Sequence, residues 1–241
     1  MSTYVLVHGS WHDGDLWKPV ATHLTGMGHD VRTPTVAGHG AGVAKNVTHD
    51  DCVASIVDYI AGADLRDVIL LGHSFGGTVI ARVAEEIPDR LRRLIFWNAF
   101  VPAPGNSLLD EVPPHYKALF DQLAASTDDD TVAMPFPIWR EAFIQDADAE
   151  LAASTHAQLS TEPYQPFRDK LDLTRFYATE LPKSYINATE DTALPPGEWG
   201  WHPRMSSRLG MYRLVQLPGS HEVMFTAPER LAAAIDAAGR D

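Results

Sequence analysis

The pentapeptide Gly-His-Ser-Phe-Gly, residues 72–76, holds the side chain best placed to do chemistry. An apolar run, Val68–Leu71, precedes it and an amphipathic stretch, 77–84, follows it. This order predicts a buried strand, a sharp corner at Ser74 and then a helix. The two glycines remove Cβ atoms that would collide where strand and helix approach, and the strained corner points the hydroxyl out of the sheet. The pattern indicates a serine nucleophile.

A serine hydroxyl needs a base to take its proton, so a histidine must lie within hydrogen-bond reach. Of the 11 histidines, His221 follows the last predicted strand (212–216) and precedes the last predicted helix (226–238). That loop lies at the carboxyl edge of a parallel sheet, where ligands bind. His73 is set aside, because the strained turn points it away from the serine hydroxyl. We therefore expect His221 to be the base.

An acid should follow the preceding strand, 183–187, and orient the imidazole. Glu190 and Asp191 both stand just past that strand. Either carboxylate could hold the ring in the correct tautomer and stabilise the imidazolium. We favour Asp191, because a short carboxylate suits a turn directly after a strand, and we keep Glu190 as the alternative.

Acyl transfer also needs donors for the tetrahedral oxyanion. One is the amide of Phe75, directly after the serine, and the other is the amide of Ser10, in the loop after the first strand. The glycine before Ser10 is expected to let that loop turn sharply toward the cavity. Trp11 in this loop, and one of Trp199 and Trp201 beyond the acid, are candidates to line the pocket; of these two we favour Trp199.

No metal or cofactor is expected. His8 and His12 have an i, i+4 spacing that binds metal on a helix, but here they flank a glycine turn and no third ligand is evident. We interpret both as structural loop residues.

Short apolar runs alternate with helical patterns along the chain, which is typical of a parallel sheet covered by helices on both faces. The predicted strands are 4–7, 29–33, 68–71, 94–98, 183–187 and 212–216. Helical patterns cover 17–27, 50–61 and 226–238, and another helix follows Ser74. We therefore expect an α/β fold with a mostly parallel sheet of about six strands.

The alternation stops between residues 102 and 182, a proline-rich stretch with helical fragments at 115–125 and 139–153. A connection this long usually forms a functional structure of its own. We expect a helical lid, or cap, over the carboxyl edge of the sheet. The core would then comprise residues 1–101 and 183–241.

Composition narrows the class of partner. The formal net charge of −13 argues against nucleic acid and anionic membranes, which would repel the chain. The single cysteine excludes an intrachain disulfide. The N-terminus enters a strand at once, without the charged and apolar regions of a signal peptide. We expect a cytoplasmic protein that acts on a neutral or weakly polar small molecule.

Five segments spread over almost the whole chain match one family pattern. They are Val-Leu-Val-His-Gly-Ser-Trp-His-Asp-Gly (5–14), Gly-His-Ser-Phe-Gly-Gly (72–77), Asn-Ala-Phe-Val-Pro (98–102), Ala-Thr-Glu-Asp (188–191) and Gly-Ser-His (219–221). Together they resemble the plant methylesterase and hydroxynitrile lyase branch of the α/β-hydrolases. The resemblance implies a six-stranded core that lacks the first two strands of the full fold. It also supports Asp191 over Glu190 as the acid.

The resemblance and the residues together predict a serine hydrolase that cleaves a small or medium carboxylic ester through an acyl-enzyme on Ser74. Lyase members of the branch carry a lysine after the catalytic histidine and a threonine in the first oxyanion loop. Here those positions are Glu222 and Ser10, and an acidic side chain would repel cyanide. A lyase or carbon–carbon bond hydrolase with the same triad, and a non-catalytic ligand-binding protein on this scaffold, remain the alternatives.

Overall fold

Six parallel strands form one sheet in the order β2-β1-β3-β4-β7-β8 in the computed structural model, which describes residues 1–240. Because every neighbouring pair runs parallel, all the carboxyl ends lie at one edge. The predicted parallel α/β fold is confirmed. The strands are β1 (Thr3–Val7), β2 (Asp30–Arg32), β3 (Val68–His73), β4 (Leu91–Trp97), β7 (Lys183–Ala188) and β8 (Arg213–Leu217).

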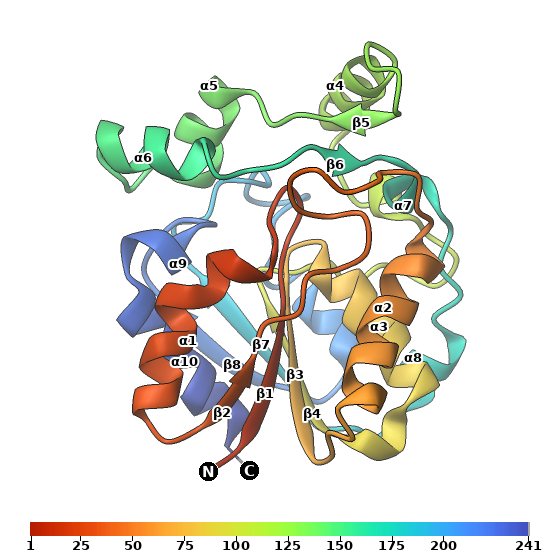
Figure 1. Ribbon diagram of the computed structural model, residues 1–241, viewed down its shortest axis with the longest axis vertical. Coiled ribbons are helices and arrows are strands. Elements are labelled where there is room, and N and C mark those ends of the chain that lie inside the picture. The colour runs from red at the N-terminus through yellow and green to blue at the C-terminus, as the bar shows by residue number, and fades with distance from the viewer. Residues whose placement is uncertain (241) are drawn as a thin grey trace.

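Helices cover both faces of this sheet (Figure 1). Side chains alternate along β1, so that Val5 and Val7 join the apolar core under α2 and α3, whereas Tyr4 and Leu6 join the core under α1 and α10. None of the helices in residues 1–240 combines the length and the apolar character needed to cross a bilayer. The flanking helices are α1 (Lys18–Gly26), α2 (His49–Gly62), α3 (Gly76–Glu86), α9 (Val223–Thr226) and α10 (Pro228–Gly239).

Between β4 and β7 the chain leaves the sheet, and we call residues 102–182 the cap. In Figure 1 most of the cap lies over the carboxyl edge of the sheet, opposite both termini, while α8 descends beside α3. The boundaries of the cap as a separate domain stay a prediction. Its elements are α4 (Pro114–Ala124), β5 (Thr131–Val132), α5 (Phe136–Ile138), α6 (Ala149–His156), β6 (Glu162–Pro163), α7 (Gln165–Arg168) and α8 (Thr174–Ala178).

The cap has two features that the sequence did not predict. Its strands β5 and β6 form a short antiparallel ladder. The helix predicted over 139–153 is interrupted: 139–143 is a single π-helical turn, and α6 begins only at Ala149. The late start of α6 has a local cause. The Asp148 side chain accepts the amide of Leu151 as an N-cap, and aspartate is favoured at an N-cap over the interior of a helix.

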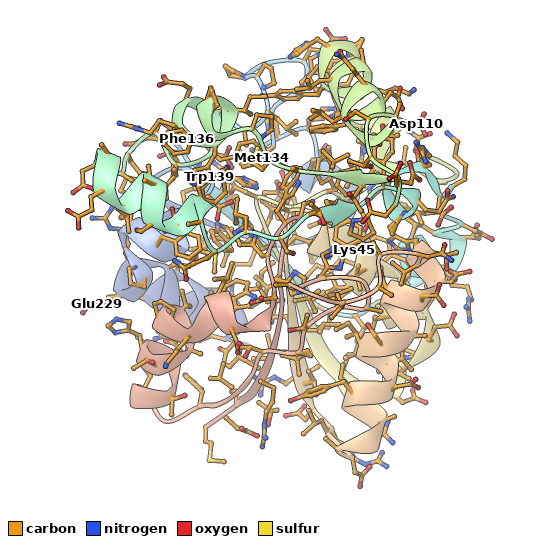
Figure 2. All side chains as sticks on the ribbon, turned by 45° about the horizontal axis from the view of Figure 1, so that its top comes forward. Lys45, Asp110, Met134, Phe136, Trp139 and Glu229 are labelled. Atoms are coloured by element: carbon orange, nitrogen blue, oxygen red, sulfur yellow. The ribbon has the colours of Figure 1, made fainter. Side chains whose placement is uncertain are left out.

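An aromatic side chain of the cap, Trp139, packs on the core: the centroid of its ring lies 6.4 Å from that of Phe225. Trp139, labelled with Met134 in Figure 2, is fully buried, and its indole N–H donates to the carbonyl of Ala152 in α6 at 3.1 Å. Both Trp139 and Met134 belong to the same apolar cluster as the α2/α3 face of the sheet. Cap and sheet therefore share one continuous core on this side.

Candidate active site

Ser74 stands at the corner between β3 and α3 with a φ of 51°, a left-handed conformation that is uncommon for a residue with a side chain. The flanking glycines make the corner possible. A Cβ on Gly72 would lie 2.5 Å from the carbonyl oxygen of Gly76, and a Cβ on Gly76 would lie 2.7 Å from that of His8. The glycines thus allow the end of β3 to approach the start of α3, and allow α3 to pack against the loop after β1.

His221 lies in the loop between β8 and α9, with Asp191 beside it from the loop after β7. Oδ2 of Asp191 accepts from Nδ1 of His221 at 2.6 Å, and both side chains are about 1% exposed. Because Nδ1 is engaged, Nε2 is the nitrogen left to face a serine hydroxyl. Of the two carboxylates predicted at this position, the structure brings Asp191 to the histidine, whereas Glu190 is exposed.

Asn98 is a site residue that the sequence interpretation missed. It directly follows β4, is fully buried, and has a φ of 33°. Its Oδ1 accepts the amide of Ala188 at 2.7 Å, and its Nδ2 donates to the carboxylate of Asp191. The available signal was its position: an asparagine ending the strand next to β3, at the same sheet edge as Ser74. Asn98 fixes the loop that presents the acid.

The amides of Ser10 and Phe75 are both available as donors. Within residues 1–240, neither N–H donates a hydrogen bond to another protein group. The Ser10 side chain lines the same cavity as Ser74, and the Phe75 amide lies at the start of α3, where the helix dipole is positive. Trp11, in the same loop, is left-handed, with a φ of 64°.

Gly9, the glycine before Ser10, lies close to the residues at the end of β3. A Cβ there would lie 3.0 Å from Cβ of Ser74 and from Nδ1 of His73. The missing side chain lets the loop after β1 pack directly against His73 and Ser74.

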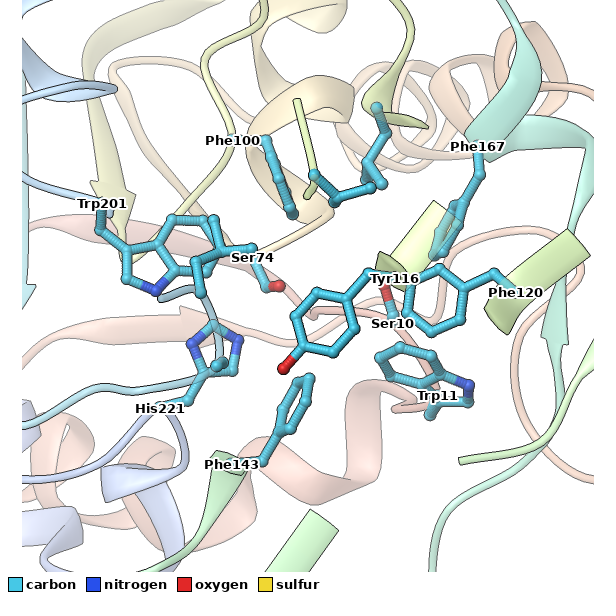
Figure 3. A pocket seen from close by; sticks show the side chains of 14 residues that line it. Ser10, Trp11, Ser74, Phe100, Tyr116, Phe120, Phe143, Phe167, Trp201 and His221 are labelled. Carbon is cyan, nitrogen blue, oxygen red and sulfur yellow. The ribbon is translucent and has the colours of Figure 1, made fainter. Parts of the chain in front are cut away.

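A cavity with about 370 Å³ of empty space lies between the sheet edge and the cap (Figure 3). Ser10, Ser74 and His221 are its polar groups from the core. The cap adds one more, Tyr116, whose hydroxyl lies on the side of His221 in Figure 3. The rest of the lining is apolar: Trp11, Phe100, Leu108, Val112, Phe120, Phe143, Phe167, Ala193, Leu194 and Trp201.

Trp201, and not the predicted Trp199, lines this cavity. The Trp201 ring stacks on the His221 imidazole, with centroids 5.2 Å apart and planes 16° from parallel. Trp199 is half-buried and carries the guanidinium of Arg204 over its ring at 5.0 Å. The two tryptophans are only two residues apart in an irregular loop, so spacing in the sequence could not separate them.

Two buried imidazoles in the site have opposite pKa shifts. Burial disfavours the charged form of His221, but the carboxylates of Asp191 and Glu222 outweigh it and raise the pKa above its ordinary value. Burial, together with the nearby His221, lowers the pKa of His73 well below the usual range. His221 is therefore the imidazole of the two that can accept and hold a proton near neutral pH.

One group of three described side chains has the donor set of a metal site. Ligand atoms of His12, His73 and Glu222, all buried, lie within 4.8 Å of one another. Nε2 of His12 is 3.2 Å from Oε2 of Glu222, an ion-pair distance, although the angle is not that of a hydrogen bond. Of the two histidines predicted to be structural, His8 accepts the Val36 amide at 3.0 Å, whereas His12 belongs to this cluster.

Comparison with known proteins identifies relatives along the whole chain. The model of the alpha/beta hydrolase family matches residues 4–234. A "Carbendazim hydrolyzing esterase" from Nocardioides sp. (strain SG-4G) is 30% identical, over 99% of this chain and 100% of its own length. "Methylesterase 4" of Arabidopsis thaliana is 24% identical, over 95% of this chain and 93% of its own, which confirms the resemblance to the plant branch.

A solved structure has nearly the same fold. It is described as an "Extracellular alpha/beta-hydrolase from Paenibacillus species" that "shares structural and functional homology to Tobacco Salicylic Acid Binding Protein 2". It is 43% identical, with a TM-score of 0.98, and the match covers 100% of both chains.

Proposed function

This chain belongs to the alpha/beta hydrolase family, and from that premise we propose that it cleaves esters of apolar carboxylic acids through an acyl-enzyme on Ser74. One observation carries the proposal: Ser74 and His221 line the same cavity, and Asp191 holds the imidazole from behind at 2.6 Å. The esterase and hydrolase relatives support the same reaction class.

The geometry supports the following sequence of steps. Nε2 of His221 takes the proton of Ser74 as the serine oxygen attacks the ester carbonyl carbon. The amides of Ser10 and Phe75 stabilise the oxyanion, and Asp191 stabilises the imidazolium. The imidazolium then protonates the departing alkoxide. Water, deprotonated by His221, attacks the acyl-enzyme, and the proton returns to Ser74 as the acid leaves.

The cavity favours a neutral ester with an apolar, often aromatic, acyl group. Its walls are aromatic and aliphatic side chains, the predominant lining of small-molecule sites. A carboxylate on the substrate would lose its hydration among these walls, and the lining residues include no lysine or arginine to pair with it. Tyr116 is the cap residue that could hydrogen-bond a polar group on such a substrate.

The test is acylation of Ser74. We expect p-nitrophenyl butyrate to give a burst of nitrophenol, and a fluorophosphonate to label the peptide that carries residue 74 in a mass-spectrometric digest. Ser74→Ala should fold normally and lose both the label and ester turnover. Parallel assays with cyanohydrins and diketones address lyase and carbon–carbon cleavage. Ester hydrolysis that persists in Ser74→Ala would eliminate the proposal.

A further inference from the structure

Trp11, the residue after the oxyanion donor Ser10, is held by the cap through hydrogen bonds to its amide, its carbonyl and its indole ring. Its amide N–H donates to Oε2 of Glu162 at 2.7 Å. Its carbonyl accepts the amide of Ser160 at 2.9 Å, and its indole N–H donates to the carbonyl of Val132, also at 2.9 Å. Val132 and Glu162 pair across the β5–β6 ladder, so both strands of the ladder hydrogen-bond to Trp11 of the core.

Glu162 is an unusual group for this position, because its side chain is completely buried. A buried carboxylate is costly unless its oxygens are hydrogen-bonded. While Oε2 accepts from Trp11, Oε1 lies 3.0 Å from Nε2 of His39. The other nitrogen of His39 lies 3.0 Å from the carbonyl of Ala37. Both ring nitrogens thus face acceptors, which fixes His39 and the carboxylate against each other.

The pair formed by Glu162 and His39 also contacts Phe75, the residue that supplies the second oxyanion donor. The His39 ring stacks on the ring of Phe75, with centroids 5.5 Å apart and an interplanar angle of 25°. Glu162 therefore contacts the loop of Ser10 directly and the residue that supplies the other amide through His39. The two donor residues, Ser10 and Phe75, belong to the core, whereas Glu162, which is linked to both, belongs to the cap.

The backbone of Trp11 needs such support. A bulky residue with a φ of 64° is strained and keeps that conformation only where its surroundings enforce it. Without an acceptor for its N–H, the Ser10–Trp11 peptide can rotate as Trp11 leaves the left-handed region, and Ser10, whose own N–H is the oxyanion donor, moves with it. An oxyanion donor displaced in this way no longer meets the developing charge.

We propose that Glu162 is a positioning residue through which the β5–β6 ladder of the cap sets the two oxyanion donors. The inference rests on the proposed function, since it assigns Glu162 a part in the same reaction. Glu162 is not among the residues that line the cavity, so it acts through Trp11 and His39 and not on the substrate. In this enzyme the cap completes the oxyanion hole as well as covering the pocket.

The test compares Glu162→Ala, Glu162→Gln and Glu85→Ala. Glu85 is the matched control: a buried glutamate at the far end of α3, which accepts the amide of Phe176 at 2.7 Å. For Glu162→Ala we expect kcat to fall on the order of 100-fold with KM changed less than about threefold, the pattern of a lost oxyanion donor. Glu162→Gln, which keeps an acceptor for Trp11, should recover most of the loss. Glu85→Ala should retain kcat.

A second readout separates positioning from general loosening. A trifluoromethyl ketone forms the oxyanion with Ser74, so its affinity should fall by the same factor as kcat/KM in Glu162→Ala. If that variant does not fold, His39→Phe serves in its place, because it keeps the stack on Phe75 but removes the partner of Glu162. We expect it to lower kcat about tenfold, which is less than the effect of losing one oxyanion donor completely.

The outcomes distinguish this inference from the proposed function. A wild-type enzyme that fluorophosphonate does not label contradicts the proposed function itself. A labelled, active wild type in which Glu162→Ala and Glu85→Ala have equal kcat and equal ketone affinity overturns the inference. So does a Glu162→Gln variant as impaired as Glu162→Ala.

Discussion

Two buried carboxylates act on His221, and as the proposed base it would set the pH range of activity. Asp191 bonds its ring, and Glu222 is its neighbour in the chain. Burial lowers the pKa of His221, but the two carboxylates raise it further, so that the net shift is upward. A base must be neutral to accept a proton. Activity is therefore complete above the raised pKa and is lost as the pH falls through it.

The first prediction concerns the loss of activity at low pH. We expect kcat/KM to decline with a midpoint above about 6.5, the ordinary value for histidine. Glu222→Gln removes one of the two charges that raise the pKa, so the midpoint should move to lower pH. The measurement is kcat/KM for a neutral ester between pH 5 and 9. A midpoint that moves upward in Glu222→Gln, or not at all, contradicts this account.

The second prediction concerns Asn98, which fixes the acid loop. In Asn98→Ala the amide of Ala188 loses its acceptor and Asp191 loses a donor. An unpaired buried group costs about 1–3 kcal/mol, and displacing a catalytic group by about 1 Å can cost 100-fold in rate. We expect kcat to fall on the order of 10- to 100-fold, with lowered thermal stability.

Asn106→Ala is the control for Asn98→Ala. Its side-chain amide donates to Glu111 at 3.0 Å, and its backbone hydrogen bonds also join residues of the cap. It should lose stability without a comparable loss of kcat. Equal losses of kcat in the two variants would remove the role of Asn98.

Among the elements of the fold, β3, α3 and the loop after β1 contact one another at the start of α3. The third prediction is that Gly76→Ala disrupts this meeting, because a Cβ there would lie 2.7 Å from the carbonyl oxygen of His8, a backbone atom that cannot yield easily. We expect at least a 100-fold loss of kcat/KM, by analogy with the loss of an oxyanion donor, and a lower melting temperature.

Gly26→Ala is the matched control for that substitution. Gly26 lies in the last turn of α1, and no atom stands within 4 Å of the Cβ that would be added. Alanine is the better helix former by about 0.5–1 kcal/mol, so this variant should be as stable as the wild type or more so and fully active. An active, stable Gly76→Ala would show that the close approach is not required.

The whole molecule carries a formal net charge of −13, and its cavity has apolar walls. Both features disfavour an anionic substrate: the field repels it during approach, and the walls remove its hydration. The fourth prediction is that an ester bearing a free carboxylate on its acyl group has a kcat/KM at least tenfold below that of its neutral amide analogue, a difference of about 1.4 kcal/mol.

Salt separates the two causes. Salt at about 1 M shortens the Debye length to about 3 Å, so the part of the difference that comes from the long-range field should disappear while the part due to burial persists. The measurement is kcat/KM for both esters at low and high salt. Equal rates for the two esters at low salt contradict the prediction.

The amino-acid sequence by itself determined the strands, their parallel arrangement and the residues that meet at the sheet edge. Strand and helix periodicity act over a few residues, and so do the steric demands of the glycines around Ser74. The order of strands then forces the loops that carry Ser10, Ser74, Asp191 and His221 to one edge. These features could be predicted because each depends on neighbours in the chain or on a regular rule of the fold.

The tertiary structure decided what joins these residues to the rest of the molecule. Asn98 meets Asp191 across 93 positions of the chain, and Glu162 meets Trp11 across 151. Trp201 instead of Trp199 faces His221 because an irregular loop sets their directions. None of these contacts follows from a local pattern. Only the contact of Glu162 with Trp11 lies where the cap packs on the core, but all three depend on packing, which is set by the shapes of all the surrounding side chains at once.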